Sequence, residues 1–583
     1  MKIGIDFGST YSTISAYFPR EDNVTALTLV EGESASIPSV VSINKKGKVT
    51  CGKAAKDQLG KRTVRTFEAF KMLLNEPDQA LLSARGYDEQ FTPRYLTRIY
   101  LDSLLQGMLL RYAEERFENA VVCVPEVWCK KVNTLDGRAI LREILQHELD
   151  APVDHVKVVT EPEAASAYFA YHYEKETGKA FNGHLLLIDY GGGTLDITMT
   201  EVVSDGSGHM EISFRAGGGA GENHDGTLGS AGIAYMQQVV ALAMLEHGIL
   251  NSLDELDYTN PDFVGAVRDL ESQLKSPNRM KDIEDYFGSY GSGYSDLKEV
   301  LDDEPEEFLS LEYEGEELPV YYQTLLRAYQ GAIEGILVEQ IAQINRHVQE
   351  KIGADPCEPA AGMRDNFKIA LVGGFGSFYL VKKQLAEIYK LDANEKIDLR
   401  TKNIHADKRE LAISLGAALL AAGKVEQKKT ARFSIGLYTA GQDKRYRPNY
   451  AIRYLQDVEP GKPYYILRNP EAPDSQGNRM VFGALYNNIR HFVINFNEQN
   501  DRGGLMALKP SMLTRLSKIP RAGFWNIGFS LDESDIVHFH ISPAVFGRFV
   551  PSGDDPARKE TVIPLDNYVG MFELTEVKEV FAE

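Results

Sequence analysis

Apolar and polar positions alternate along two stretches of the chain, and a short glycine-rich turn divides each stretch in the middle. Residues 2–18 read KIGIDFGSTYSTISAYF, and residues 185–202 read LLLIDYGGGTLDITMTEV. Alternation with a period of two is typical of β-strands. Each stretch therefore predicts two strands joined by a tight turn, with an aspartate, Asp6 or Asp189, at the end of the first strand.

A third glycine-rich turn follows an unbroken apolar run instead of an alternating one. Residues 367–389 read FKIALVGGFGSFYLVKKQLAEIY, which predicts a buried strand, a turn and then a helix. Strand and helix patterns alternate in this way up to residue 424, whereas residues 431–583 show short strand patterns separated by turn residues. The sequence thus predicts an α/β domain over residues 1–424, followed by a mostly-β domain over residues 431–583.

Two polar segments interrupt this organisation. Residues 425–430 read VEQKKT and predict a short polar linker between the two domains. Residues 278–307 are acidic and rich in glycine, serine and tyrosine, which is typical of a surface loop or a short acidic helix. A solvated excursion is favoured over a partner site for this insertion, because loops commonly run over the surface.

The three glycine-rich turns are suited to phosphate binding. Successive backbone N–H groups in a tight turn form an anion-binding nest, and glycine lets the backbone approach a ligand closely. Aspartates beside such turns would repel phosphate unless a cation intervenes, and Mg²⁺ prefers a few carboxylates together with water. Any one turn alone fits a simple hairpin equally well, but three together favour a Mg²⁺–nucleotide site. The candidate phosphate-binding residues are Gly8, Ser9, Thr10, Tyr11, Gly191, Gly192, Gly193, Thr194, Gly373, Gly374, Gly376 and Ser377.

Composition excludes some other classes of function. The net charge of −21 over 583 residues argues against a nucleic-acid surface. The sequence has neither an apolar run of membrane-spanning length nor a signal-peptide pattern, so we expect no membrane association. The four cysteines form no CxxC pair, which favours the reducing cytoplasm over a disulfide or zinc framework.

Ordered motifs over residues 1–424 resemble the Hsp70 chaperone family, within the actin, sugar-kinase and Hsp70 ATPase superfamily. The motifs are IGIDFGSTYSTIS, RTFEAFKMLL, AVVCVPEVW, VVTEPEAASAYFAY, LLLIDYGGGTLDIT, LVGGFGS and ELAISLGAAL. The resemblance implies a duplicated, two-lobed actin-like ATPase domain that binds ATP and Mg²⁺ between its lobes.

The resemblance also implies roles for individual residues. Asp6 and Asp189 would hold Mg²⁺ through its water ligands, and Lys71 would orient the attacking water and stabilise charge on the γ-phosphate. Glu161, Thr194 and Asp196 complete the implied catalytic set, with Asp189 a member of it as well. Gly229 and Ser230 match a further phosphate segment, and Glu271 and Lys275 lie where the family carries a basic adenosine clasp. That clasp departs from the family pattern, so we expect weak adenine selectivity.

The segment after residue 430 matches the family only in size and position. It resembles a β-type substrate-binding domain without the helical lid, and residues 426–429 lack the leucines of the family's linker. Coupling between the domains would then be weak or would use a direct interface between folded domains. We expect an ATP-hydrolysing, Hsp70-like chaperone that binds protein clients or a dedicated partner, with co-chaperones. The alternative is a nucleotide-dependent scaffold with little ATP turnover.

Overall fold

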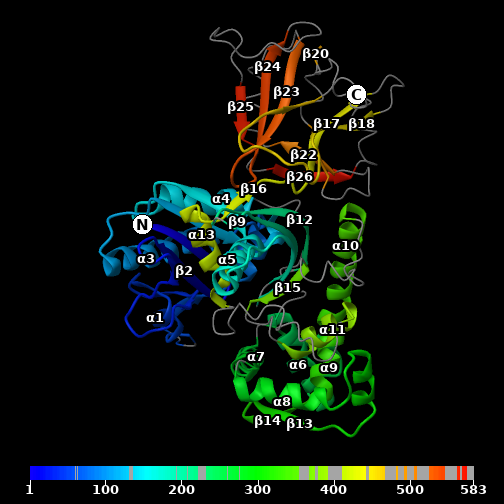
Figure 1. The fold of residues 1–583 in the computed structure, drawn as a ribbon. Helices are drawn as coiled ribbons and strands as arrows, with labels where there is room; N and C mark the ends of the chain where they lie inside the picture. Colours follow the sequence, from blue (N-terminus) through cyan, green and yellow to red (C-terminus); the bar gives the residue numbers. More distant parts are fainter. Residues whose placement is uncertain are drawn as a thin grey trace.

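The computed structural model describes residues 1–59, 61, 63–129, 136–191, 194–206, 208–220, 232–258, 260–274, 276–352, 367–373, 378–390, 410–440, 446–466, 481–483, 491–495, 504–508, 524–544, 561–564 and 568–573. These residues form a mixed α/β structure with several sheets. The body comprises the described residues up to 424, and a group of strands from the end of the chain stands above it (Figure 1). The α/β fold class predicted from the sequence is therefore confirmed at this coarse level.

The first sheet of the body is built around the first predicted hairpin. β1 runs antiparallel to β2 and parallel to β8, and the strand order is β3-β2-β1-β8-β9, with β4 paired to β2. Strands β1, β2, β8 and β9 are buried at nearly every position, their polar residues included, because helices cover both faces. The strands of this sheet are β1 (Lys2–Phe7), β2 (Tyr11–Phe18), β3 (Asn23–Ala26), β4 (Ile37–Pro38), β8 (Asn119–Val124) and β9 (Val156–Thr160).

The second sheet repeats this arrangement around the second predicted hairpin. β10 runs antiparallel to β11 and parallel to β15, in the order β15-β10-β11-β12-β16. In both sheets, the strand that ends in the predicted aspartate pairs with its hairpin partner on one side and a later parallel strand on the other. The strands are β10 (Gly183–Tyr190), β11 (Leu195–Ser204), β12 (Met210–Ala220), β15 (Phe367–Val372) and β16 (Glu426–Lys428).

Two helices, α5 (Glu161–Thr177) and α13 (Ala412–Ala422), pack against each other between the two sheets. Their close approach depends on small residues. A Cβ at Gly416 would lie 1.6 Å from the carbonyl oxygen of Ala164, and a Cβ at Gly4 would lie 2.2 Å from the backbone nitrogen of Ala418. The glycine and alanine pattern of residues 412–422 thus brings the first turn of α5 close to both hairpins.

The remaining body residues between 232 and 352 form a helical layer with a two-stranded sheet at the lower end of Figure 1. The acidic insertion belongs to this layer: α8 and η5 bury Ile283, Phe287, Leu297 and Val300. It is therefore a packed element whose apolar side faces the core, and only its acidic side is solvated. The elements are α6 (Gly232–Glu246), α7 (Pro261–Leu274), α8 (Pro277–Gly288), η5 (Ser295–Leu301), β13 (Glu307–Tyr313), β14 (Glu316–Tyr321), α9 (Tyr322–Tyr329), η6 (Gln330–Glu334) and α10 (Gly335–Ile352).

Further elements complete the described body. They are β5 (Val41–Asn44), β6 (Val49–Cys51), α1 (Lys53–Lys56), β7 (Val64–Phe67), η1 (Phe70–Leu73), α2 (Gln79–Ala84), α3 (Pro93–Tyr112), η2 (Glu126–Cys129), α4 (Gly137–Glu143), η3 (Ile144–Glu148), η4 (Leu253–Glu255) and α11 (Tyr379–Ile388). α3 begins after Thr92, whose Oγ1 accepts a hydrogen bond from the backbone N–H of Tyr95 at 3.1 Å, which is a typical helix N-cap.

The strands after residue 430 form two sheets, β18-β17-β21-β22-β26 and β19-β23-β24-β25, with β20 paired to β23. We call them the C-terminal sheets. They stand on the side of the body that carries α4, β9 and β16 (Figure 1). Their strands are β17 (Ser434–Ala440), β18 (Tyr446–Ile452), β19 (Tyr464–Tyr465), β20 (Val481–Gly483), β21 (His491–Asn495), β22 (Gly504–Leu508), β23 (Phe524–Leu531), β24 (Val537–Ala544), β25 (Thr561–Pro564) and β26 (Tyr568–Glu573).

Residues 425–430, which the sequence predicts to be a short polar linker, are packed in the structure. Residues 426–428 form β16, which adds to the edge of the second sheet by pairing parallel with β12. Lys429 and Thr430 are buried. The sequence misses this because polar side chains suggest solvent, whereas an edge strand is held by backbone hydrogen bonds and here also by ion pairs.

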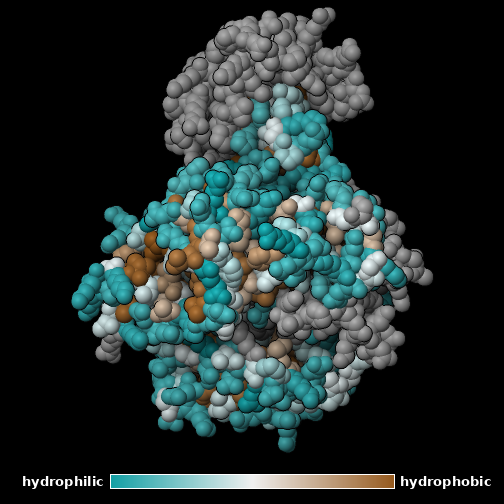
Figure 2. Space-filling view, turned by 60° about the vertical axis from the view of Figure 1, so that its left-hand side comes forward, coloured by the Kyte–Doolittle hydropathy of each residue, from teal (hydrophilic) through white to brown (hydrophobic). Residues whose placement is uncertain are grey.

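The face of the described residues shown in Figure 2 is largely hydrophilic, with hydrophobic residues gathered in patches on the body. This agrees with a chain in which 25% of residues are charged. Within the described ranges, no helix combines the length and the apolar character that a membrane span requires.

Candidate functional site

The turn between β1 and β2 is formed by Gly8, Ser9 and Thr10 and is very tight. A Cβ at Gly8 would lie 2.0 Å from the carbonyl oxygen of Tyr11, so only glycine fits this position. Ser39 holds the turn from outside, because its Oγ donates to the carbonyl of Gly8 at 2.7 Å and its N–H donates to the carbonyl of Thr10 at 2.9 Å. All four turn residues, Tyr11 included, are half-buried, which leaves the turn accessible to a ligand.

The turn between β10 and β11 has the same construction. The N–H of Gly191 donates to the carbonyl of Thr194 at 3.0 Å, and Asp189 faces Asp196 across the hairpin. Gly373, at the end of β15, approaches this turn with a φ of +80°, and a Cβ there would lie 2.4 Å from Oδ1 of Asp189. The bare backbone at Gly373 therefore gives the Asp189 carboxylate its space.

Lys71 lies between the two hairpins on η1, which begins after Ala69 in a left-handed conformation, with φ of 54°. The side chain of Lys71 is 2% exposed, and its Nζ donates to Oε1 of Glu161 at 2.5 Å. Glu161 is the first residue of α5, whose N-terminal dipole favours a carboxylate. The structure thus brings together Lys71 and Glu161 in a buried ion pair across 90 positions of sequence.

Burial and mutual repulsion govern the ionisation of the surrounding carboxyl groups. Burial, together with the charge of Glu161, raises the pKa of Asp6 to about 7, although Lys71 opposes this. Burial and the charges of Glu161, Asp196 and Asp6 raise the pKa of Asp189 well above its ordinary value. Burial lowers the pKa of Lys71, but the charges of Glu161 and Asp6 outweigh it, so that this pKa is raised and the ammonium stays charged.

Four buried carboxyl groups around one lysine leave this region with excess negative charge, which a divalent cation would neutralise. Oδ2 of Asp189 has no hydrogen-bond partner within the described part of the chain, as expected of an oxygen that awaits a ligand. No set of three or more His, Cys, Asp or Glu side chains converges as direct metal ligands in the described ranges. The excess carboxylate charge and the unpaired Asp189 oxygen fit Mg²⁺, which keeps several waters and uses one or two carboxylates.

Several predicted residues lie outside the described residues, and one, Glu271, lies on an element other than those that carry this cluster. Those outside are Gly192, Gly193, Gly229, Ser230, Lys275, Gly374, Gly376 and Ser377. Glu271 is half-buried on α7. On the same helix, Arg268 pairs with Glu68 at 2.5 Å, so its charge is directed to the segment before η1.

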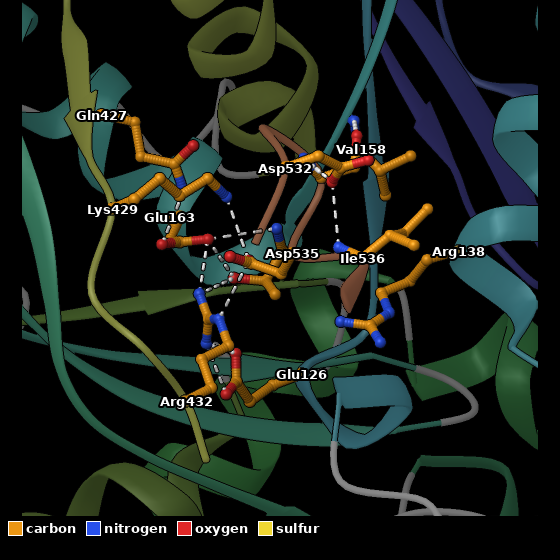
Figure 3. A network of polar contacts seen from close by, with 12 residues as sticks. Glu126, Arg138, Val158, Glu163, Gln427, Lys429, Arg432, Asp532, Asp535 and Ile536 are labelled. Carbon is orange, nitrogen blue, oxygen red and sulfur yellow. Dashed lines mark hydrogen bonds and ion pairs between the residues drawn. The ribbon is translucent and has the colours of Figure 1, made fainter. Parts of the chain in front are cut away.

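Sequence reasoning missed a second cluster of buried charges close to the first, shown in Figure 3. Arg432, from the start of the C-terminal sheets, is 1% exposed and pairs with Glu126 and Glu163 of the body. Lys429 and Asp535 pair with each other at the edge of this cluster. The only signal in the sequence is the second glutamate of the EPE motif, residues 161–163, at a position where a helix buries its first turn.

Comparison with known proteins agrees with the resemblance read from the sequence. Residues 2–228 match the family model described as "Hsp70 protein". This range contains Asp6, Lys71, Glu161, Asp189 and Asp196, so both hairpins and the buried ion pair lie within the matched part. The predicted resemblance to the Hsp70 family is confirmed for this part of the chain.

Curated relatives carry the name "Chaperone protein DnaK". The protein from Nitrosopumilus maritimus (strain SCM1) is 27% identical over 220 residues, which cover 37% of this chain and 31% of the relative. The protein from Thermosipho africanus (strain TCF52B) is 23% identical over 426 residues, which cover 72% of this chain and 58% of the relative. The matched region thus spans less than two thirds of the length of each relative.

Proposed function

We propose that this chain is a Mg²⁺-dependent ATPase of the Hsp70 type, with a two-lobed actin-like domain over residues 1–424 that controls protein binding by the domain over residues 431–583. The buried Lys71–Glu161 pair is the observation that carries this proposal, because it lies close enough to Asp6 and Asp189, near the ends of β1 and β10, to affect the ionisation of both. A buried, charged lysine beside carboxylates that can hold a divalent cation suits phosphoryl transfer, because catalysis there depends on positioning and charge neutralisation.

Each residue has a defined part in this proposal. The N–H groups of the Gly8–Tyr11 and Gly191–Thr194 turns bind phosphate oxygens, and Asp6 and Asp189 hold Mg²⁺ through its waters. Bound Mg²⁺ neutralises charge on the phosphates. The Lys71 ammonium orients the attacking water and stabilises charge that develops on the γ-phosphate. Glu161 fixes the position of Lys71, while Thr194 and Asp196 orient the water network.

Mutation of Lys71 tests the catalytic part of the proposal. The native chain should hydrolyse ATP in the presence of Mg²⁺, and unfolded peptide should change the rate. Lys71→Met should lower the hydrolysis rate constant by about 100-fold or more, because it removes a preorganised charge at the reacting phosphate. Nucleotide affinity should change much less, and a fluorescent ATP analogue measures it separately. A native chain that does not bind MgATP would contradict the whole proposal.

A second candidate function is a nucleotide-dependent scaffold with little turnover. The pairing of Arg268 with Glu68 favours it, because that pairing withdraws a basic side chain from the helix expected to clasp adenosine. MgATP binding without hydrolysis in the native chain would select this candidate. In either case the proposed partners are protein clients, with co-chaperones for the chaperone function, and the proposed compartment is the cytoplasm.

A further inference from the structure

The second buried cluster is centred on the Arg432 guanidinium, which three carboxylates surround (Figure 3). Nη1 donates to both carboxylate oxygens of Glu126, at 2.6 and 2.5 Å, and Nη2 lies 2.6 Å from Oε2 of Glu163. Nε lies 3.6 Å from Oδ2 of Asp535, and the guanidinium stacks 4.1 Å from the ring centre of Phe214. All the charged edges of this arginine are therefore occupied by named partners.

Arg432 neutralises the negative charge of both glutamates, with help from Lys429 at Glu163. Glu126 is 0% exposed and Glu163 is 3% exposed, so water cannot stabilise their carboxylates. Burial raises the pKa of Glu163, but the charges of Arg432 and Lys429, with hydrogen bonds from Gln427 and Thr160, outweigh it and lower that pKa to about 2. Glu163 therefore stays ionised while Arg432 is in place.

Glu163 connects Arg432 to the candidate catalytic pair through the first turn of α5. Its Oε2 accepts hydrogen bonds from Oγ1 of Thr160 at 3.0 Å and from the backbone N–H of Thr160 at 3.3 Å. The next residue, Glu161, reaches Lys71. The orientation of this turn therefore determines where the Glu161 carboxylate meets the lysine.

Glu126 provides a second connection. It begins η2, which also carries Trp128, and the Lys71 Nζ lies 5.9 Å from the centre of that indole ring. Arg432 thus holds two carboxylates of the body, and each belongs to a segment that also contacts Lys71.

Among the described residues, other contacts between the C-terminal sheets and the body involve different partners. Asp457 pairs with Arg215 of β12. In the turn between β23 and β24, Asp532 pairs with Arg142 of α4 and Glu533 pairs with His155. In the same turn, Oγ of Ser534 accepts a hydrogen bond from the N–H of Val158 at 3.0 Å. Arg142 therefore offers a matched control, because its ion pair attaches the same two parts without touching Glu163 or Glu126.

We propose that Arg432 is a positioning residue for ATP hydrolysis, supplied by the C-terminal part of the chain, which fixes the first turn of α5 and thereby the Lys71–Glu161 pair. This inference rests on the proposed function for its effect on the hydrolysis rate, and its structural consequence can be measured without turnover. An arginine suits the role because one planar fork binds two carboxylates in a fixed geometry, which a lysine cannot do.

The test compares three variants of the full chain: Arg432→Met, Arg432→Lys and Arg142→Met. Single-turnover hydrolysis measures the chemical step, and titration with a fluorescent ATP analogue measures affinity. Arg432→Met should slow hydrolysis by about 10-fold or more while nucleotide affinity changes by less than about 3-fold, since misplacement of a catalytic group acts mainly on the chemical step. Arg432→Lys should retain the fold and give an intermediate loss. Arg142→Met should change the rate by less than about 2-fold.

Hydrogen exchange gives a readout that does not depend on turnover. Amides in residues 160–165 should exchange faster in Arg432→Met and Arg432→Lys than in the native chain, and at the native rate in Arg142→Met. Native exchange in a folded Arg432→Lys variant would overturn the inference, as would equal rate losses in Arg432→Lys and Arg142→Met. If the variants show the expected differences in exchange but the native chain does not hydrolyse ATP, the proposed function and the rate effect are contradicted. The structural role of Arg432 would still be established.

Discussion

The two buried charge clusters of this protein lie on either side of the first turn of α5 and differ in how well their charges are balanced. Around Lys71, one cation faces Asp6, Glu161, Asp189 and Asp196, and the pKa of Asp6 rises to about 7. Around Arg432, by contrast, hydrogen bonds and cations hold the pKa of Glu163 at about 2. A buried cluster with unbalanced charge is costly unless a ligand completes it, whereas a balanced cluster holds structure together.

This difference predicts opposite results from removing one carboxylate at each cluster. Asp189→Asn should lower Mg²⁺-dependent ATP hydrolysis by about 100-fold or more, because it removes a metal-holding charge at the site. The free energy of unfolding without Mg²⁺ should not decrease, since the change relieves repulsion among buried carboxylates. Hydrolysis assays and urea denaturation measure the two quantities. Native turnover in Asp189→Asn, at matched circular dichroism, would contradict the assignment of Asp189.

At the Arg432 cluster, where two cations face three carboxylates, we expect the reverse pattern for stability. Glu126→Gln breaks a fully buried pair with Arg432 and should cost about 3–5 kcal/mol of unfolding free energy. Glu143→Gln, which breaks an exposed pair with Arg94, is the matched control and should cost less than about 1 kcal/mol. Urea denaturation that shows equal losses in both variants would mean that the Arg432 cluster is no more structural than a surface ion pair.

The two clusters also differ in how well the sequence predicts them. Asp6 and Asp189 were found because period-two alternation and glycine turns are local signals, and the structure places both at the ends of hairpin strands. Lys71 and Glu161 came from resemblance to a family, because no local pattern relates residues 90 positions apart.

Arg432 was missed for a physical reason. It follows a run of polar residues that reads as solvated linker, and its partner Glu126 lies 306 positions away. A buried ion pair leaves no periodic trace in the sequence, because tertiary packing alone excludes water from it. The acidic insertion contains a helix, one of the two interpretations of its sequence, but its charges hide the apolar side that buries Ile283 and Phe287.

Changes of pH should separate the clusters further. Because the pKa of Asp6 is raised to about 7, its carboxyl group binds a proton below that pH, and the proton competes with Mg²⁺. Mg²⁺-nucleotide affinity should therefore fall by about 10-fold between pH 8 and pH 6. Calorimetry in buffers of different ionisation enthalpy should show proton release on binding near pH 7.

Asp6 should affect the stability of the ligand-free protein in the direction opposite to its effect on Mg²⁺-nucleotide affinity: stability should decrease, not increase, as pH rises. A carboxyl group whose pKa is raised in the folded state favours folding when protonated, so this contribution is lost as pH rises through about 7. Glu163 has a lowered pKa, and its contribution is lost only as pH falls below its ordinary value of 4.5 towards about 2. Pairing at Arg432 should therefore be constant between pH 6 and pH 8.

Mg²⁺-nucleotide affinity that does not vary between pH 6 and pH 8 would contradict the ionisation assigned to Asp6.

The smallest effect is expected at a third ion pair, between Arg268 of α7 and Glu68 before η1, which also joins distant parts of the chain. The Arg268–Glu68 pair tests whether an ion pair that joins distant segments is strong for that reason alone, or only when it is buried. Arg268 is 47% exposed and Glu68 is 40% exposed, so water and salt screen the pair. Arg268→Gln should change the free energy of unfolding by less than about 1 kcal/mol, and added salt should abolish the change. Urea denaturation at low and high ionic strength measures both effects. A loss of about 3 kcal/mol that persists in high salt would show that an exposed pair can be as strong as the buried one at Arg432, and that charge balance alone does not distinguish structural from functional clusters here.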